Sequence, residues 1–355
     1  MNFEINKTQF NINLPNSINN LLIHSYRSTY ELDFNNIDKD VKVLITKLSN
    51  KNDFIVMDRN IYNLYNFDIK DNIYLVDANE KNKTIYSSLD IFQKMYDDNF
   101  NKSNKLIVVG GGITQDISSF VSAIYKRGIN WIFIPTTLLS MCDSCIGAKN
   151  ALNHNDAKNQ IGLFYAPSKV YINKNFLNTL SIGDIKSGLG EIIKLFLIGG
   201  REFMDKLDNI SNLSDNNYLI ELVYYALLIK KVVIELDEFD KNERNALNYG
   251  HTFGHIIEEL SDYSIPHGIA VFMGMKIINN LFNFNCEYVN KLNNFIISDY
   301  NIRNINTSTF KQLLLNDKKV KNNKIKLIIL EDYGKTTFKE VEITNHFIEK
   351  VINLI

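Results

Sequence analysis

The sequence predicts an α/β protein in which an N-terminal domain built on a parallel sheet precedes a mainly α-helical C-terminal domain. Short β-branched runs alternate with polar, helix-like stretches between residues 41 and 165, which is typical of the βαβ units of a Rossmann-like domain. After about Ser181 the pattern changes to long helical stretches. Because 355 residues exceed one typical domain, we expect a first domain over residues 1–180 and a second over 181–355.

Five apolar runs are the predicted strands of the first domain. Each is short and bounded by turn-forming or charged residues, as expected for strands buried on both faces of a sheet. In such sheets, ligands bind beyond the carboxyl ends of the strands. The runs are VKVLI at 41–45, FIVM at 54–57, IYLV at 73–76, LIVV at 106–109 and WIFI at 131–134.

The second half of the chain is predicted to be helical over residues 218–238, 254–260 and 267–284. Near its end, KIKLIIL at 324–330 followed by EDYGKTTF predicts a strand pair or hairpin. The first 40 residues are polar and give no clear pattern.

Composition narrows the class of partner. The 39 basic and 40 acidic residues leave a net charge of -1, so no global field favours nucleic acid or an anionic membrane. No run approaches the ~18 apolar residues of a membrane span, and the N-terminus shows no targeting signal.

Three cysteines are too few for a disulfide framework and fit the cytoplasm. With no second CxxC in the chain, we interpret Cys142 and Cys145 as small buried residues rather than a redox pair or half a zinc site.

A glycine-rich segment, GGGITQD, directly follows the strand predicted at 106–109. It places Gly110 to Gly112 before Asp116 and a helix expected from Ile117. Backbone without Cβ atoms can approach a pyrophosphate closely, and the helix N-terminus offers free N–H groups to it. A dinucleotide is the expected ligand, and a tight strand-to-helix turn that needs glycine is the alternative.

Neighbouring segments add polar groups to this prediction. Thr136 and Thr137 lie just beyond the next predicted strand, where their hydroxyls could meet the same ligand. Lys149 and Lys158 stand in segments containing glycine and asparagine, which we interpret as phosphate-binding loops. The alternative is that both are solvated loop lysines.

A histidine cluster predicts a metal site. His251 and His255 are four residues apart, so on a helix they share one face, and His267 follows twelve residues later. Three of the six histidines thus fall within 17 residues, and neutral imidazole is a common zinc ligand. A catalytic zinc site takes three protein ligands and keeps one position open.

Charged residues near the histidines extend this prediction. Glu191 and Lys194 share a helical face within an apolar stretch, so Glu191 could complete the metal site; the alternative is a surface salt bridge. Lys230, Arg244 and Asn248 would form an anion-binding pocket beside it.

Taken together, the motifs resemble those of the sugar phosphate cyclases, most closely the 3-dehydroquinate synthase family. The segments GGGITQD, PTTLLSMCDSCIGAKNALNH, AKNQIG, SGLGEIIK and NYGHTFGH followed by IPHG occur in the family order between about Asp58 and Gly334. The resemblance implies an NAD-binding α/β domain and a helical domain that binds a divalent metal, zinc or cobalt. It assigns the metal to Glu191, His251 and His267, and moves His255 to the substrate and phosphate cluster.

The resemblance also implies the other site residues and a homodimer. NAD contacts are implied for Glu80, Lys83, Gly110, Gly111, Gly112, Asp116, Thr136, Thr137, Asp143, Lys149, Lys158, Phe176, Leu177 and Thr179. Catalytic and substrate contacts are implied for Lys149, Asn159, Lys194, Lys230, Arg244, Asn248, His255 and Lys319, or its neighbour Lys318. Arg127 corresponds to an arginine that reaches the site of a neighbouring subunit.

The implied reaction converts 3-deoxy-arabino-heptulosonate 7-phosphate to 3-dehydroquinate and phosphate, a step of the shikimate pathway to aromatic amino acids. It proceeds through transient oxidation by NAD, β-elimination, reduction and intramolecular aldol closure. Lys230 and Arg244 suit a substrate carboxylate. One alternative is a cyclase acting on another sugar phosphate of an aminocyclitol or surface-sugar pathway. A second is a metal-dependent alcohol dehydrogenase of the glycerol dehydrogenase type, which would accumulate NADH. A third is a catalytically silent binding module.

Overall fold

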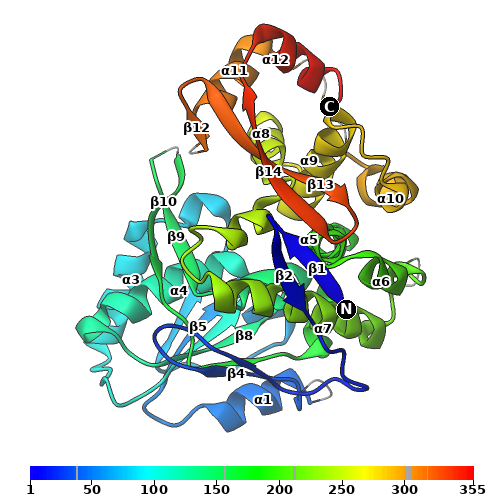
Figure 1. Cartoon of the computed structure of the whole chain (residues 1–355). Helices are drawn as coiled ribbons and strands as arrows, with labels where there is room; N and C mark the ends of the chain where they lie inside the picture. The colour runs from blue at the N-terminus through cyan, green and yellow to red at the C-terminus, as the bar shows by residue number, and fades with distance from the viewer. Residues whose placement is uncertain (37–38, 156, 211–212, 301, 303–304, 318) are drawn as a thin grey trace. The chain divides into compact units, whose positions relative to one another are not determined.

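The computed structural model describes residues 1–36, 39–155, 157–210, 213–300, 302, 305–317 and 319–355 (Figure 1). The chain forms two compact units. The parallel-sheet unit contains Pro15–Ser181 and Leu213–Leu227, and the helix-rich unit contains Met1–Leu14, Ile182–Asn212 and Leu228–Ile355. The division expected at residues 180 and 181 stays a prediction, and it did not anticipate that Met1–Leu14 group with the second half of the chain.

A seven-stranded sheet forms the core of the parallel-sheet unit, in the order β3-β4-β11-β8-β7-β5-β6. Only β3 runs antiparallel to its neighbour; the other pairs are parallel, which confirms the predicted sheet. Every residue of β7 and β8 is buried, as expected for strands covered on both faces. The strands are β3 (Leu21–Ile23), β4 (Tyr30–Asp33), β5 (Phe54–Asp58), β6 (Ile73–Val76), β7 (Leu106–Gly110), β8 (Trp131–Pro135) and β11 (Lys169–Tyr171).

The remaining elements of this unit are helices and a hairpin. Its α-helices are α1 (Val41–Leu48), α2 (Arg59–Leu64), α3 (Ile85–Asp97) and α4 (Gly112–Ile124). Short helical turns are η1 (Glu80–Asn82), η2 (Tyr125–Arg127), η3 (Ser140–Ser144) and η4 (Lys174–Thr179), and the hairpin joins β9 (Lys149–His154) to β10 (Ala157–Phe164). Helix α4 packs on β7, β8, β5 and α3.

Two local predictions in this unit were wrong. The run VKVLI is the start of α1, because Asp40 caps the helix by accepting hydrogen bonds from the N–H groups of Lys42 and Val43. Its buried residues Val41, Leu44 and Ile45 follow helical spacing. Helix α4 begins at Gly112 rather than Ile117, so Asp116 lies within the helix. The other four predicted strands are confirmed as β5, β6, β7 and β8.

The helix-rich unit confirms the predicted helical half of the chain. The predicted helices correspond to α7, α8 and α9, with ends that differ by at most three residues. Helix α7 crosses from one unit to the other. The elements are α5 (Ile182–Gly199), α6 (Arg201–Met204), η5 (Asp205–Leu207), α7 (Asn216–Leu236), η6 (Glu243–Asn248), α8 (His251–Leu260), α9 (His267–Leu281), α10 (Glu287–Ile297), α11 (Thr307–Leu315) and α12 (Asn345–Ile352).

A second sheet completes the helix-rich unit. Its order is β12-β13-β14-β1-β2, and the predicted hairpin is confirmed as β13 and β14, which pair antiparallel. The strands β1 and β2 come from the uninterpreted N-terminus, and β1 pairs in parallel with β14. Their bounds are β1 (Asn2–Ile5), β2 (Thr8–Asn11), β12 (Val320–Lys321), β13 (Lys324–Asp332) and β14 (Lys335–Glu342).

Glycines let α5, α8 and α9 pack backbone against backbone. A Cβ atom on Gly190 of α5 would lie 2.0 Å from the carbonyl oxygen of Gly268 in α9. A Cβ atom on Gly274 of α9 would lie 2.0 Å from the carbonyl oxygen of Gly250, which caps α8. No side chain fits at such separations. This close packing places the neighbours of these glycines, Glu191, His251 and His267, near one another.

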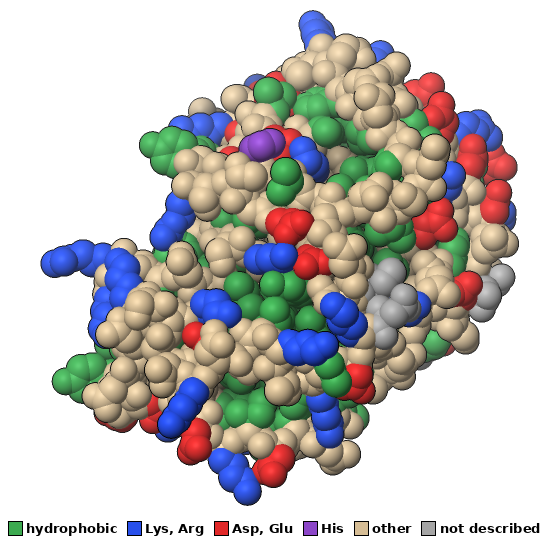
Figure 2. Space-filling model, turned by 90° about the horizontal axis from the view of Figure 1, so that it is seen from below, with side chains coloured by type: hydrophobic (Ala, Val, Ile, Leu, Met, Phe, Trp, Pro, Cys, Tyr) green, Lys and Arg blue, Asp and Glu red, His purple; other side chains and the backbone are tan. Residues whose placement is uncertain are grey.

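Basic and acidic side chains are interspersed on the face shown in Figure 2, in keeping with the near-zero net charge. Among the described residues, none of the helices combines the length and the apolar character that a membrane span requires.

Candidate active site

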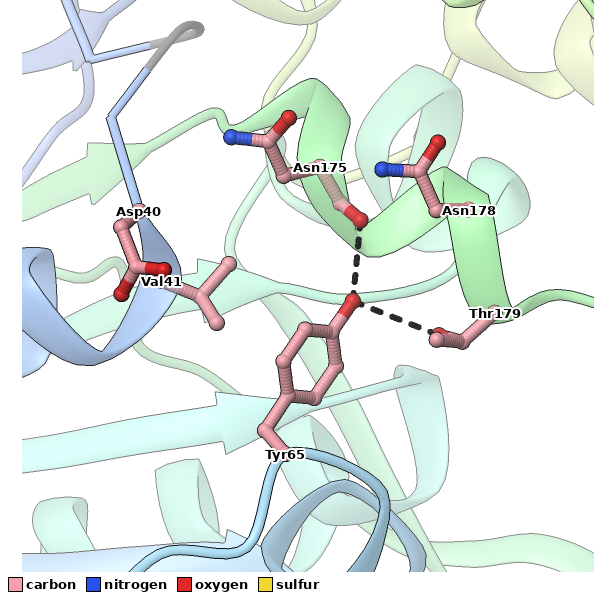
Figure 3. A pocket seen from close by; sticks show the side chains of 6 residues that line it. All are labelled: Asp40, Val41, Tyr65, Asn175, Asn178 and Thr179. Carbon is pink, nitrogen blue, oxygen red and sulfur yellow. Dashed lines mark hydrogen bonds between the residues drawn. The ribbon is translucent and has the colours of Figure 1, made fainter.

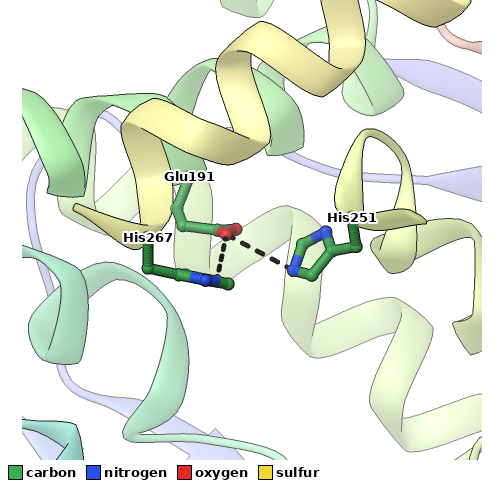
Figure 4. A group of neighbouring side chains, drawn as sticks. All are labelled: Glu191, His251 and His267. Carbon is green, nitrogen blue, oxygen red and sulfur yellow. Dashed lines mark ion pairs between the residues drawn. The ribbon is translucent and has the colours of Figure 1, made fainter. Parts of the chain in front are cut away.

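The middle of α5 and the first residues of α8 and α9 bring Glu191, His251 and His267 together in the helix-rich unit (Figure 4). Glu191 lies in α5 next to Gly190, while His251 and His267 are the first residues of α8 and α9. The Oε1 atom of Glu191 lies 3.5 Å from Nε2 of His251 and 3.2 Å from Nε2 of His267. Two ligands about 2.1 Å from one tetrahedral ion lie roughly 3.4 Å apart. These separations and donor types therefore fit a divalent metal ion.

The carboxylate of Glu191 is buried and ionised. Its side chain is 1% exposed, and its ion-pair partner Lys194 is 2% exposed, so the alternative of a surface salt bridge is wrong. Burial alone would raise the pKa of Glu191, but the charge of Lys194 and the hydrogen bond to His267 lower it to about 2. A buried anion at this point is a ready ligand for a cation.

Both histidines direct Nε2 toward Glu191 because Nδ1 faces an acceptor. The Nδ1 atom of His251 lies 3.3 Å from the carbonyl oxygen of Tyr249, and Nδ1 of His267 lies 3.1 Å from Oε2 of Glu258. An acceptor opposite Nδ1 places the ring hydrogen there and leaves the Nε2 lone pair for a metal. Desolvation alone would lower the pKa of His267, but the carboxylates of Glu191 and Glu258 raise it to about 10. A metal that binds at Nε2 therefore displaces the hydrogen that this atom donates to Glu191.

Positive charge surrounds His251. Burial, followed by the charges of Lys194, His267, His255 and Lys319, lowers the pKa of this histidine well below its usual value. The Nζ atom of Lys319 donates to Oγ1 of Thr252, at 2.8 Å. The ring centroids of His251 and His255 lie 5.4 Å apart. The structure thus gathers these predicted anion-binding residues about the metal ligands, whereas Lys318 lies outside the described residues.

The turn η6 carries Arg244 and Asn248 and packs against α5. Arg244 is 3% exposed, and its guanidinium donates to the carbonyl oxygen of Glu238. Its backbone N–H donates to Asp237 Oδ2, at 3.1 Å, as does that of Asn242, at 2.7 Å. Burial would raise the pKa of Asp237, but the backbone N–H groups of Lys241, Asn242 and Arg244 lower it. Lys230, the remaining predicted substrate residue of this unit, is 6% exposed on α7.

The glycine loop lies between β7 and α4 in the parallel-sheet unit. A Cβ atom on Gly110 would lie 2.6 Å from Cβ of Thr114, so a tight turn is sufficient reason for glycine there. At Gly112 the nearest atom to a Cβ would be Oγ of Ser144, at 3.8 Å, which is ordinary van der Waals contact. Gly111 is the N-cap of α4 and supplies no side-chain hydrogen bond, so no capping side chain competes with an anion for the N–H groups of the first turn of α4.

The predicted threonines behave differently from one another. The Oγ1 atom of Thr137 donates to Oγ of Ser140, at 2.8 Å, and accepts from the Ser140 N–H group, so this hydroxyl caps the following helical turn. Thr136 is 1% exposed, and its N–H donates to the carbonyl oxygen of Gly110, at 3.0 Å. Both residues lie beside the glycine loop; Thr136 is buried and Thr137 is half-buried.

A polar cluster around Lys83 joins four predicted cofactor or substrate residues. Lys83 Nζ lies 2.9 Å from Oδ1 of Asn159, 3.3 Å from Oδ2 of Asp116 and 3.4 Å from Oε1 of Glu80. Burial raises the pKa of Asp116 to about 6, although Lys83 opposes the shift. Sequence reasoning missed Asn153, which donates to Oε1 of Glu80, at 2.9 Å.

Other predicted cofactor residues of this unit are spread over several elements. Lys149 is exposed at the start of β9, and Lys158 lies in β10; the segments interpreted as loops therefore form a hairpin. Phe176 and Leu177 are buried in η4. Asp143 lies in η3, beside the buried free thiols of the CxxC, which confirms their interpretation as packing residues.

Thr179 lines a pocket of about 400 Å³ with Asp40, Val41, Tyr65, Asn175 and Asn178 (Figure 3). Tyr65 donates to the carbonyl oxygen of Asn175, at 2.9 Å, and lies 3.4 Å from Oγ1 of Thr179. Of the lining residues, only Thr179 belongs to the predicted NAD set. The pocket was not visible in the sequence because its walls come from three separated segments.

Comparison with known proteins identifies the family. The sequence model of the 3-dehydroquinate synthase N-terminal domain matches residues 73–187, and that of the C-terminal domain matches residues 188–320. The 3-dehydroquinate synthase of Pelagibacter ubique (strain HTCC1062) is 37% identical over 350 residues, covering 90% of this chain and 92% of the relative. The chain belongs to the 3-dehydroquinate synthase family.

Solved structures agree on the fold of this 3-dehydroquinate synthase family member. A 2-deoxy-scyllo-inosose synthase complexed with carbaglucose-6-phosphate, NAD+ and Co2+ superimposes with a TM-score of 0.80 at 22% identity, covering 94% of this chain and 99% of that one. The 2-epi-5-epi-valiolone synthase of Streptomyces hygroscopicus subsp. jinggangensis 5008, with NAD+ and Zn2+ bound, gives a TM-score of 0.79 at 19% identity, with coverages of 97% and 99%. At these identities the likeness supports the dehydroquinate synthase-like fold alone.

Proposed function

We propose that this chain is a 3-dehydroquinate synthase, a phosphate-eliminating lyase that cyclises 3-deoxy-arabino-heptulosonate 7-phosphate to 3-dehydroquinate. The observation that carries the proposal is the buried Glu191 carboxylate, with two histidine Nε2 atoms within 3.5 Å and a cationic neighbour in Lys194. Relatives described as 3-dehydroquinate synthase, at 32 to 37% identity, support the specific reaction.

Glu191, His251 and His267 would hold the divalent metal. Bound there, zinc or cobalt supplies Lewis acidity toward a hydroxyl and the ketone formed from it. Lys194 keeps Glu191 ionised, and the backbone carbonyl of Tyr249 fixes the orientation of the His251 ring. These contacts hold the ligands in place before a substrate arrives, which lowers the reorganisation needed during the reaction.

Cations of the helix-rich unit bind the acidic parts of the substrate. Arg244 and Lys230 suit a carboxylate, because a guanidinium can donate two parallel hydrogen bonds and an ammonium adds a point charge. His255 and Lys319 suit the phosphate and stabilise the negative charge that develops as it leaves. Asn248, one turn before His251, is a further proposed contact.

The parallel-sheet unit would bind NAD, which supplies a hydride acceptor that is regenerated within each cycle. The N-terminus of α4, which has no side-chain cap, suits the pyrophosphate. Glu80, Lys83 and Asp116 form a preassembled polar cluster for the ribose side of the cofactor. Lys149 and Asn159 are proposed, from the family resemblance, as contacts to both cofactor and substrate.

We also propose a homodimer working in the cytoplasm. Arg127 is exposed and follows Lys126, and both adopt left-handed backbone conformations with φ of 63° and 46°. Such a tight turn presents the side chain outward, where a second copy of the chain can use it. The three cysteines are free thiols, which suits a reducing compartment.

The test is incubation of the purified chain with 3-deoxy-arabino-heptulosonate 7-phosphate, NAD and zinc, with measurement of phosphate release, the carbocyclic product and NADH. We expect stoichiometric phosphate and product without net NADH. Turnover of a neutral heptulose phosphate but not of the sugar acid would indicate a different cyclase. Net NADH would indicate an alcohol dehydrogenase.

A further inference from the structure

Glu258 is a buried carboxylate that the proposed reaction does not use. It lies in the last turns of α8, is 5% exposed, and faces Nδ1 of His267 with Oε2 at 3.1 Å. The His267 ring is therefore held between two carboxylates, because its Nε2 atom lies 3.2 Å from Glu191. A buried carboxylate is costly unless it is paired, so its placement beside a metal ligand needs a reason.

We propose that Glu258 is a positioning residue for the metal site: its carboxylate accepts the Nδ1 hydrogen of His267 and turns the Nε2 lone pair toward the site formed with Glu191 and His251. His251 supports this role for an acceptor at Nδ1, because its own Nδ1 faces the carbonyl oxygen of Tyr249, at 3.3 Å. Each metal-facing imidazole thus has its far nitrogen fixed by an acceptor, one from the backbone and one from Glu258. Such outer acceptors orient a ligand and raise its basicity.

A competing arrangement uses the same side chains. His255, Glu258 and His267 also bring three ligand atoms within 4.8 Å of one another, so they form a possible second metal site. That site would need the Nδ1 lone pair of His267 while the first site uses the Nε2 lone pair. A neutral imidazole has only one lone-pair nitrogen, so both sites could fill only if His267 lost its last ring hydrogen. A single metal with Glu258 as acceptor requires no such loss.

The inference rests on the metal site of the proposed function, and the experiment separates the two. Metal stoichiometry and affinity are measured by titrating cobalt, and separately zinc, against a competing chromogenic chelator. Wild type is compared with E258A, E258Q and the control E259Q, which changes the exposed neighbour on the same helix. NAD binding and circular dichroism verify that each variant is folded.

We expect one metal equivalent in wild type and an affinity about 10- to 100-fold weaker in E258A. In E258Q the metal affinity should fall less, about three- to tenfold, because the amide oxygen still accepts the Nδ1 hydrogen bond but carries no charge. E259Q should match wild type. If E258A does not fold, E258Q decides alone.

Two results would overturn the inference. One is unchanged metal affinity in the folded Glu258 variants, and the other is two equivalents in wild type with one lost in E258A. Absence of any metal binding by wild type would instead overturn the proposed function.

Discussion

Arg244 is fixed by contacts to its own loop before its guanidinium meets any ligand. Asp237 accepts hydrogen bonds from the backbone of this loop, and the guanidinium donates to Glu238. A buried arginine so constrained can bind a carboxylate with little further loss of side-chain entropy. If Arg244 binds a substrate carboxylate, its contribution to kcat/KM should depend on whether the substrate carries that group.

R244A tests this contribution. A hydrogen bond to a charged group contributes about 1.5–3 kcal/mol, so kcat/KM for the acidic heptulose phosphate should fall about tenfold to a hundredfold. A neutral sugar phosphate should show a much smaller change. R201A, which removes an exposed arginine of the same unit, serves as the control in steady-state assays. Equal losses on both substrates would argue that Arg244 does not bind a carboxylate.

Single residues of the metal site were predictable to different degrees. The histidine spacing predicted a metal site because residue type and helical period are both visible in a sequence. The choice of Glu191, His251 and His267 over His251 and His255 needed the family resemblance. Glu258 was missed although it lies one helical turn beyond His255, because its role depends on which ring nitrogen of His267 it faces.

At the scale of elements, the crossing of α5 and α9 fixes the separation of Glu191 and His267. Each of these two proposed metal ligands stands next to a glycine of the crossing, Gly190 or Gly268. The obstacle to a side chain at Gly190 is backbone, at 2.0 Å, which cannot move aside as a flexible side chain would. Any substitution there must separate the helices and hence the ligands.

G190A should therefore reduce stability and metal affinity together. Overpacking typically costs about 1–3 kcal/mol, and we expect the upper part of that range in urea unfolding, with at least a tenfold loss of zinc affinity. G183A makes the same change in the first turn of α5 at a partly exposed position and should be neutral or slightly stabilising. Wild-type zinc affinity in G190A would show that the crossing does not set the ligand geometry.

The contact between α4 and the Lys83 cluster predicts a pH effect on stability. Asp116 has a pKa raised from 3.8 to about 6, so between these values the folded protein binds a proton that the unfolded chain releases. Protonation of Asp116 therefore adds to the free energy of unfolding below about pH 4, and this stabilisation is lost as the pH rises through 6.

D116N, which cannot ionise, should gain stability relative to wild type over that interval. The gain is about 2 kcal/mol after allowance for the partial exposure of the side chain, measured by urea unfolding of the NAD-free protein from pH 4 to pH 8. D97N, which removes an exposed carboxylate of α3, should show no such trend. A difference between D116N and wild type that does not change with pH would contradict the assignment.

The elements themselves were predictable where the apolar pattern was unambiguous. Three of the four confirmed runs are the central strands β5, β7 and β8, whose burial on both faces leaves no other pattern, whereas the fourth is the half-buried edge strand β6. The run at residues 41–45 is too short to distinguish a strand from a buried helix face by periodicity alone. The N-cap residue Asp40 was the signal in the sequence that could have predicted a helix at this run, and it begins α1.

At the scale of the whole molecule, the pairing of β1 with β14 joins the two ends of the chain. No local pattern could predict it, because the partner of Glu4 is Lys335 and sequence periodicity carries no information about partners so distant. The polar N-terminus is ordered by this pairing and by the antiparallel pairing of β1 with β2. Phe3 and Ile5 are buried as a result.

A homodimer in which Arg127 acts in the partner's site makes a prediction about mixed subunits. R127A lacks the exposed arginine, and H251A lacks a metal ligand, so each homodimer should be nearly inactive. In a mixed dimer, the R127A subunit keeps its metal ligands and receives Arg127 from the H251A subunit. One of the two sites is then complete.

The purified mixed dimer should therefore have about half of wild-type activity per dimer, because one of its two sites works. The measurement is phosphate release after co-expression of differently tagged chains, with the mixed dimer purified through both tags. Co-expressed R127A and R127A/H251A chains are the control and should stay inactive, since no subunit supplies the arginine. If Arg127 acts within its own subunit, no mixed dimer has a complete site, and activity will not return in either experiment.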